Sequence, residues 1–294
     1  MKIAYLVFAY KNPDVIERVT EKLSTDDCAF FIHIDQKSSI TQFSRICGEN
    51  IFYTEKRIPV YWAEFTGIEA ILLLIRQALA SAQDYNYFVL LSGSDYPLRS
   101  ARYIHQFLER NRGTEFMDIV KVPAPGKPLS RINTLRPPSS KPVHRFAARV
   151  LAKMGLAQRD YRESLGGLDA YAGNTWWALT REACQYISEF VENNPHLGQF
   201  FKDVFAPEES FFHTILGNSA YRPRIRRNLV YEDWSASVAH PAMINDRHIA
   251  FFQEQENVRV NDVFGDGELL FARKFSDGNP ELLQRMDEMI EAKG

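Results

Sequence analysis

Cysteine is scarce in this sequence, and uninterrupted apolar runs are short. Its three cysteines, Cys28, Cys47 and Cys184, are odd in number and too scattered for a disulfide framework or a zinc site. A longer apolar stretch, residues 68–82, is interrupted by charged residues, so no segment reaches the ~20 apolar residues of a membrane span. The apolar run 3–10 is too short for a signal peptide. These absences predict a cytoplasmic protein.

Acidic residues are missing from one region of an otherwise balanced chain. Over the whole chain 35 Lys and Arg face 37 Asp and Glu, which argues against a nucleic-acid partner. Residues 119–159, by contrast, contain nine Lys and Arg and no acidic residue. Six prolines fall within residues 123–143, and because proline removes hydrogen-bond donors an extended loop is predicted there. We therefore predict one domain, residues 1–294, with a basic, proline-rich insertion at about residues 121–160.

The insertion contains one stretch that can form a helix. In residues 144–156, Arg145, Arg149 and Lys153 fall in one stripe beside three apolar residues. A basic amphipathic helix of this kind lies in the interface of an anionic membrane, which predicts peripheral contact with the inner membrane face. The same cations could instead face an acidic acceptor, or the stretch could be a solvated loop. The sequence leaves all three interpretations open.

Apolar runs alternate with helical patterns through the first hundred residues. Residues 3–9 predict a buried strand, and Asn12 is predicted to cap the helix that follows it. A second predicted strand, residues 29–35, ends in Asp35, and residues 60–62 predict a short strand or edge segment. Residues 87–91 are apolar or aromatic throughout, as a strand buried on both faces of a parallel sheet requires. The alternation predicts an α/β fold with a mostly parallel central sheet flanked by helices.

A polar loop, Ser92-Gly93-Ser94-Asp95, follows this third strand. Ligands of open α/β sheets bind beyond the carboxyl ends of the strands, so the loop can present hydroxyls, backbone N–H groups and one carboxylate to a pocket. The same residue types are common in solvated turns. On this loop alone, the two interpretations have equal support.

Two further stretches carry side chains suited to saccharide chemistry. Trp176 and Trp177 lie in a predicted strand, residues 173–179, so one ring is expected in the core while the other can face the C–H face of a sugar. Glu208 and Glu209 follow Pro207 at the start of a predicted helix, residues 206–216. Because the helix dipole favours acidic residues there whatever the function, this pair alone is not diagnostic.

Several motifs, in this order along the chain, resemble those of one enzyme family. They are His33-Ile34-Asp35-Gln36-Lys37-Ser38, Val60-Tyr61-Trp62, Leu91-Ser92-Gly93-Ser94-Asp95-Tyr96-Pro97-Leu98, Pro207-Glu208-Glu209 and Phe271-Ala272-Arg273-Lys274-Phe275. Together they resemble the core-2/I-branching β-1,6-N-acetylglucosaminyltransferases and peptide O-xylosyltransferases, glycosyltransferase family 14. The low cysteine content agrees with a bacterial-type member.

The resemblance implies a Rossmann-like glycosyltransferase A fold, a UDP-sugar donor with N-acetylglucosamine or xylose favoured, and inversion at the anomeric carbon. It also implies that neither a metal ion nor another cofactor is needed. Metal-dependent relatives hold their cation with an Asp-x-Asp motif, which is absent from these 294 residues. The acceptor is then expected to be a hydroxyl of a saccharide or glycolipid.

The resemblance also assigns roles to single residues. Glu209 matches the catalytic glutamate, the general base, and Glu208 is the alternative. Lys274 matches the family's phosphate-contacting lysine. Arg259 matches the family's phosphate-contacting arginine, and Arg273 is the alternative for that role. The donor-contacting set is Ala9, Asp35, Ser94, Asp95, Arg259, Arg273 and Lys274, with Asp35 on the uracil. The acceptor-contacting set is Trp176, Trp177, Glu208 and Trp234. Tyr10 and Lys11 depart from the family pattern, which usually has a pair of histidines there.

Two other functions remain possible on the sequence. A metal-dependent glycosyl- or nucleotidyltransferase could use Asp95 with Asp266 or Glu268 to hold magnesium or manganese. A non-catalytic saccharide-binding protein could use the tryptophans and the basic insertion, with the two glutamates merely starting a helix.

Overall fold

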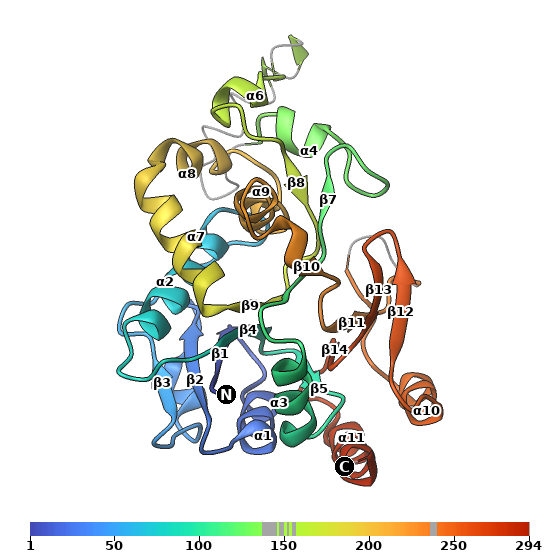
Figure 1. Ribbon diagram of the computed structural model, residues 1–294. Coiled ribbons are helices and arrows are strands. Elements are labelled where there is room, and N and C mark those ends of the chain that lie inside the picture. The colour runs from blue at the N-terminus through green and yellow to red at the C-terminus, as the bar shows by residue number, and fades with distance from the viewer. Residues whose placement is uncertain (137–145, 147–149, 152, 155–156, 236–239, 294) are drawn as a thin grey trace.

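A seven-stranded sheet forms the centre of the fold in the computed structural model, which describes residues 1–136, 146, 150–151, 153–154, 157–235 and 240–293 (Figure 1). Strand β9 runs antiparallel to both of its neighbours, and the other paired strands are parallel. The sheet has the order β10-β6-β9-β4-β1-β2-β3, with β1 (Ile3–Ala9), β2 (Cys28–Ile34), β3 (Ile51–Tyr53), β4 (Tyr87–Ser92), β6 (Glu115–Met117), β9 (Trp177–Thr180) and β10 (Ile225–Arg226).

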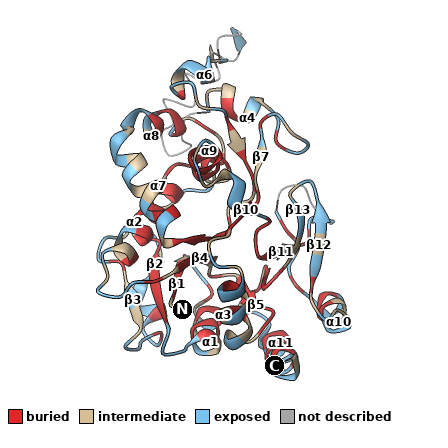
Figure 2. Cartoon of the chain, in the orientation of Figure 1, coloured by how far each residue is buried: buried red, intermediate tan, exposed pale blue. Residues whose placement is uncertain are grey.

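Helices cover both faces of this sheet. The long helices are α1 (Pro13–Leu23), α2 (Thr66–Leu79), α3 (Ala101–Arg110), α7 (Arg181–Asn193) and α11 (Pro280–Lys293). Helices α2 and α7 pack on one face, while α1, α3 and α11 gather on the other (Figure 1). Strands β1, β2 and β4 are therefore almost wholly buried, as Figure 2 shows. The predicted α/β class, a mostly parallel sheet flanked by helices, is confirmed.

A smaller sheet continues from the carboxyl end of β4. Strand β5 (Asp95–Pro97) pairs antiparallel with β14 (Phe271–Arg273), which pairs parallel with β11 (Val230–Glu232). The register sets Arg273 between two carboxylates, opposite Asp95 on one side and Glu232 on the other. Side chains opposite each other on paired strands interact directly, so sheet pairing itself builds this ionic cluster.

The remaining elements are short segments around the two sheets. Strands β12 (Arg259–Asp262) and β13 (Gly265–Glu268) form a hairpin, and β7 (Val120–Lys121) pairs with β8 (Tyr171–Ala172). The others are η1 (Ile40–Phe43), α4 (Ser130–Asn133), α6 (Tyr161–Ser164), α8 (Pro195–Phe201), η2 (Pro207–Glu209), α9 (Phe211–Gly217), η3 (Arg222–Arg224) and α10 (Asp246–Glu254).

Two local predictions about secondary structure were wrong. Residues 60–62, expected as a short strand, form a loop, because their backbone groups bond to the end of β2 and to helix α2 instead of to a sheet. The helix expected over residues 206–216 is split into η2 and α9. The break falls at Ser210, whose φ of −143° lies outside the helical range, while Ala206, just before η2, is left-handed at φ 48°.

Three cations of the basic insertion pair with acidic residues from elsewhere in the chain. Lys121 pairs with Asp169, 2.6 Å apart, and Lys127 and Arg131 both pair with Glu209. The predicted helix at residues 144–156 lies mostly outside the described residues, including Arg145 and Arg149. Within the described part of the chain, no helix is both long and apolar enough to cross a membrane.

Candidate active site

Hydrogen bonds join the loops that follow β1 and β2. The Asp35 N–H donates to the Ala9 carbonyl, 2.8 Å away, and Ser38 Oγ donates to the Tyr10 carbonyl, 2.7 Å away. These strands are neighbours in the parallel sheet, so their carboxyl ends meet at the same edge. The structure thus brings together Ala9 and Asp35, two of the predicted donor-contacting residues.

Asn12 attaches a third loop, the one after β4, to the same edge. Its Nδ2 donates to the Gly93 carbonyl and to Ser94 Oγ, each 2.9 Å away, and the Phe275 N–H donates to the Ser94 carbonyl at 2.8 Å. Asn12 was predicted to cap α1, but its φ of 62° turns the side chain to these partners instead. Asparagine tolerates this left-handed conformation better than most residues.

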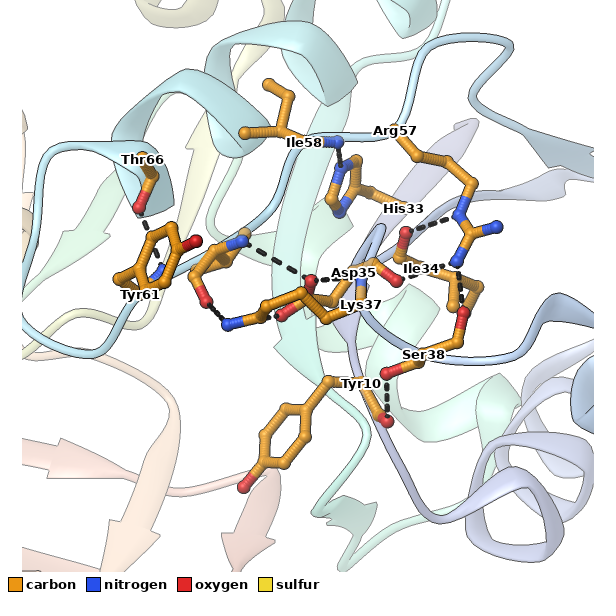
Figure 3. A network of polar contacts seen from close by, with 11 residues as sticks. Tyr10, His33, Ile34, Asp35, Lys37, Ser38, Arg57, Ile58, Tyr61 and Thr66 are labelled. Atoms are coloured by element: carbon orange, nitrogen blue, oxygen red, sulfur yellow. Dashed lines mark hydrogen bonds and ion pairs between the residues drawn. The ribbon is translucent and has the colours of Figure 1, made fainter. Parts of the chain in front are cut away.

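Asp35 sits in a polar cluster with Lys37, Val60 and Tyr61, which we call the β2 corner. Figure 3 labels Asp35, Lys37 and Tyr61 in this cluster. Its Oδ1 accepts the N–H groups of Lys37 at 2.9 Å and Val60 at 3.3 Å, and its Oδ2 lies 3.5 Å from Lys37 Nζ. The same ammonium group lies 4.3 Å from the centre of the Tyr61 ring. A carboxylate, an ammonium group and an aromatic face therefore lie close together, an arrangement suited to a ligand with a planar polar ring.

Asp95 is committed to the ionic cluster at the junction of the two sheets. Only 1% exposed, it accepts the Ser92 N–H and lies 3.3 Å from Arg273 Nε. Arg273 is also 3.8 Å from Glu232, and its guanidinium lies 3.9 Å from the centre of the Trp176 ring. Burial raises the pKa of Asp95, and the positive charge of Arg273 opposes that shift. The guanidinium group of Arg273 is thus held by Asp95, Glu232 and Trp176.

Lys274 follows this cluster directly and is half-buried. Its backbone N–H donates to the Ala242 carbonyl, 3.3 Å away, and that of Ile244 donates to the Lys274 carbonyl, 2.9 Å away. Burial lowers the pKa of its ammonium group, and the adjacent Arg273 lowers it further. An anionic ligand here would relieve both effects, since it offsets the lost solvation and the repulsion.

The Pro207–Glu209 turn, η2, presents the two predicted glutamates. The Ala206 N–H before it donates to the carbonyl of Ala63, 3.2 Å away, and both alanines have positive φ, 48° and 57°. Non-glycine residues held in this region of backbone conformation cluster at active sites and ligand clamps. The turn is thereby fixed to the loop that follows the β2 corner.

Glu209 pairs with two cations from the basic insertion. Its Oε2 contacts Lys127 Nζ and Arg131 Nη1, and its backbone carbonyl accepts the Gly173 N–H at 2.9 Å. Lys127 is buried and donates also to the Gly173 carbonyl, 2.6 Å away. The Glu209 side chain, 27% exposed, therefore has a fixed orientation while still reaching solvent.

Glu208, next to it, lies in a different environment. Its Oε2 is shielded from solvent and has no hydrogen-bond partner among the described residues. Burial raises the pKa of this carboxyl group to about 7, with a further contribution from the negative charge of Glu209. Of these two consecutive glutamates, Glu209 is therefore ion-paired and Glu208 is poorly solvated.

The structure corrects the predicted roles of some residues. Trp177 is 2% exposed and packs edge-on against Phe212, with ring centres 6.0 Å apart, so it is enclosed in the core and does not face an acceptor. Trp176 is also buried, at 6% exposed, and its ring is covered by Arg273, so neither ring of the pair faces an acceptor. Trp234, in contrast, is 45% exposed with its Nε1 3.4 Å from Glu232.

The β12–β13 hairpin holds Asp266 and Glu268, two of the three residues named for the metal-dependent alternative. Arg259, the predicted phosphate-contacting arginine, lies exposed on this hairpin and pairs with Asp266, and Glu268 accepts from the Tyr103 hydroxyl at 2.7 Å. Asp95 is engaged instead with Arg273. No group of three or more His, Cys, Asp or Glu side chains is arranged to hold a metal ion in the described ranges.

Sequence reasoning missed four contributors to the site. Glu232 joins the Asp95 cluster through strand register, and Asn12 bonds to two loops that lie 81 and 263 residues further along the chain. Lys127 and Arg131 were noted only as part of the acid-free stretch, and that unusual charge was the one available signal that they need an outside partner.

Comparison with known proteins identifies the family. The Core-2/I-Branching enzyme family matches residues 3–256. Xylosyltransferase 2 from Canis lupus familiaris is 25% identical over 98% of this chain and 33% of that protein. Xylosyltransferase 1 from the same species is 26% identical over 80% of this chain and 24% of its own length. The chain therefore spans about a quarter to a third of the length of these curated relatives.

Among solved structures, the galactosyltransferase LgtC in complex with donor and acceptor sugar analogues aligns with 98% of this chain and 95% of its own, at 12% identity and a TM-score of 0.40. The family match, over residues 3–256, includes the β2 corner, the Asp95 loop and the two glutamates. The chain belongs to the Core-2/I-Branching enzyme family.

Proposed function

We propose that this chain is an inverting glycosyltransferase that moves a sugar from a UDP-sugar, N-acetylglucosamine or xylose favoured, to a hydroxyl of a saccharide acceptor without a metal ion. The observation that carries the proposal is the loop at residues 60–63. The Val60 N–H donates to Asp35 at one end of this loop, and the Ala63 carbonyl accepts the Ala206 N–H at the other. One short loop thus ties the β2 corner to the glutamate turn.

The donor is expected to bind along the sheet edge. Asp35 would accept the imide N–H of uracil, and Lys274 would face the diphosphate. A departing diphosphate needs positive charge that is already in place, which costs no reorganisation during the reaction. Arg273 contributes indirectly, because its own charge is shared between Asp95 and Glu232.

Glu209 is the proposed general base. It would take the proton of the acceptor hydroxyl as that oxygen attacks the anomeric carbon, while the bond from that carbon to the diphosphate breaks and UDP leaves with the electron pair. A single displacement from the face opposite the leaving group inverts the configuration. Lys127 and Arg131 orient the carboxylate for this transfer.

The acceptor side rests on fewer contacts. The exposed ring of Trp234 is available for stacking on a sugar, and its N–H faces Glu232. A glycolipid acceptor, contact with an anionic membrane and a cytoplasmic location stay predictions. Flotation with anionic and neutral vesicles tests the membrane contact.

The decisive experiment measures UDP binding and UDP release from a panel of UDP-sugars, with and without EDTA. We expect UDP to bind and at least one UDP-sugar to be turned over, both unchanged by EDTA. Loss of turnover with EDTA and its rescue by manganese would indicate the metal-dependent alternative. Absence of UDP binding together with retained saccharide binding would indicate a non-catalytic lectin-like protein.

A further inference from the structure

Arg57 lies behind the β2 corner, and its hydrogen bonds to the described residues all go to backbone carbonyls. Arg57 Nε donates to the Ile34 carbonyl at 3.0 Å, and Nη2 donates to the carbonyl of Asp35 at 2.7 Å and to that of Ser38 (Figure 3). Arg57 itself is half-buried. One guanidinium group thus holds the backbone on both sides of the Asp35 turn.

These carbonyls need a partner because the sheet ends at this point. Strand β3 pairs with β2 only as far as Ile32, opposite Tyr53, and β1 pairs only as far as Ile34. A shielded carbonyl without a partner costs free energy comparable to a lost hydrogen bond. The planar guanidinium group carries five donors in a fixed fork, so it can satisfy several carbonyls at once in a way that a lysine cannot.

The residues after Arg57 bond to the same segment one after another. The Ile58 N–H donates to His33 Nε2 at 2.9 Å, and the Gln36 N–H donates to the Ile58 carbonyl at 3.1 Å. The Val60 N–H then reaches Asp35 Oδ1. Residues 57–60, which we call the strap, therefore cross the end of β2 with Arg57 as their first attachment.

We propose that Arg57 is a positioning residue for the donor: it fixes the backbone that carries Asp35 without touching the nucleotide itself. This inference rests on the proposed function, because it takes Asp35 as the contact to the donor base. If Arg57 acts only through Asp35, its loss weakens donor binding and leaves the proton transfer at Glu209 intact. The expected signature is a raised KM for the UDP-sugar with kcat preserved.

The test compares Arg57→Lys with Arg76→Lys as a matched control. Arg76 lines the same surface groove between the strap and helix α2, but its partner is Glu192 at 3.5 Å, away from the Asp35 turn. We expect Arg57→Lys to weaken UDP binding about tenfold, a loss of about 1.4 kcal/mol, with kcat within about twofold. Arg76→Lys should leave both unchanged. If Arg57→Lys fails to fold, Arg57→Gln, which keeps two of the donors, replaces it.

A double-mutant cycle separates positioning from a general loss of stability. In an Asp35→Asn background the effect of Arg57→Lys on UDP affinity should largely disappear, because both changes act on the same contact. Unchanged UDP affinity in folded Arg57→Lys, or full additivity with Asp35→Asn, overturns the inference. Absence of UDP binding to the wild-type protein overturns the proposed function instead, and the inference falls with it.

Discussion

The β2 corner and the glutamate turn are two parts of one candidate site that are built in different ways. Asp35 is held by backbone N–H groups, and its position follows directly from the end of a parallel strand. Glu209 is held by the charged side chains of Lys127 and Arg131, which come from a separate part of the chain. The corner is thus a product of backbone geometry, whereas the turn depends on charge pairing between distant segments.

Within the turn, the contrast continues between neighbouring residues. Glu209 has two cationic partners, and Glu208 has a shielded oxygen without a hydrogen bond among the described residues. The same side chain, one position apart, therefore carries its charge at low cost in one case and at high cost in the other. Experiments that change one glutamate at a time show whether this difference is also a division of roles.

The largest effect is expected from Glu209→Gln. The amide keeps the shape of the side chain but cannot accept a proton, and loss of a general base costs ~10²- to 10⁴-fold in rate. We expect kcat to fall by that amount while UDP affinity stays unchanged, since the β2 corner is not altered. Steady-state kinetics and calorimetric UDP titration measure the two quantities.

The matched control for this experiment is Glu208→Gln. It changes the neighbouring residue by the same chemistry, and we expect it to retain most of the turnover. Near wild-type turnover in Glu209→Gln with loss in Glu208→Gln would move the general base by one residue and reverse the contrast drawn above.

A smaller effect, on stability, is expected from Glu208→Gln. The pKa of Glu208 is raised from 4.5 to about 7 in the folded protein, so between these values the folded state binds more protons than the unfolded state. The contribution of this group to stability is therefore greatest below pH 4.5 and is lost as the pH rises through 7. The shift in the pKa of Glu208 corresponds to about 3 kcal/mol in the free energy of unfolding.

Replacing Glu208 by glutamine removes this dependence. At pH 8 the variant should be more stable than the wild type by on the order of 2–3 kcal/mol, and below pH 4.5 the two should converge. Urea unfolding at pH 4.5, 6 and 8 measures the difference. A gap between variant and wild type that does not change with pH would mean that Glu208 is solvated and titrates normally.

The same contrast explains how much the sequence could predict. The α/β architecture and the meeting of Ala9, Asp35 and Ser94 at one edge were predictable, because each follows a recognisable strand and parallel strands end together. The ionic cluster around Arg273 was not, because the register of a second sheet between distant segments places Arg273 between Asp95 and Glu232. The burial of Trp177 was not predictable either, since alternation along a strand does not show which face of the strand lies in the core.

Side-chain attachments across long separations were the least predictable. Nothing near Arg57 in sequence indicates that its guanidinium bonds to carbonyls about 20 residues earlier, because those bonds depend on where β3 ends. The family resemblance supplied Glu209 and Lys274 as candidates, but not the cations that hold Glu209. Predicting such contacts requires knowledge of the three-dimensional path of the chain.

The smallest of the expected effects concerns the diphosphate and compares Lys274 with Arg259. Lys274 is half-buried beside the Asp95 cluster, whereas Arg259 lies on an exposed hairpin in an ion pair with Asp266. Loss of a charge-assisted hydrogen bond costs about 1.5–3 kcal/mol, so Lys274→Ala should weaken UDP binding at least about tenfold. Uridine, which lacks the diphosphate, should bind almost as before. Exposed ion pairs contribute about 0–1 kcal/mol, and Arg259→Ala should therefore change neither affinity appreciably. Equal losses for UDP and uridine in Lys274→Ala would place the diphosphate elsewhere, and a selective loss of UDP in Arg259→Ala would show that the hairpin moves onto the donor.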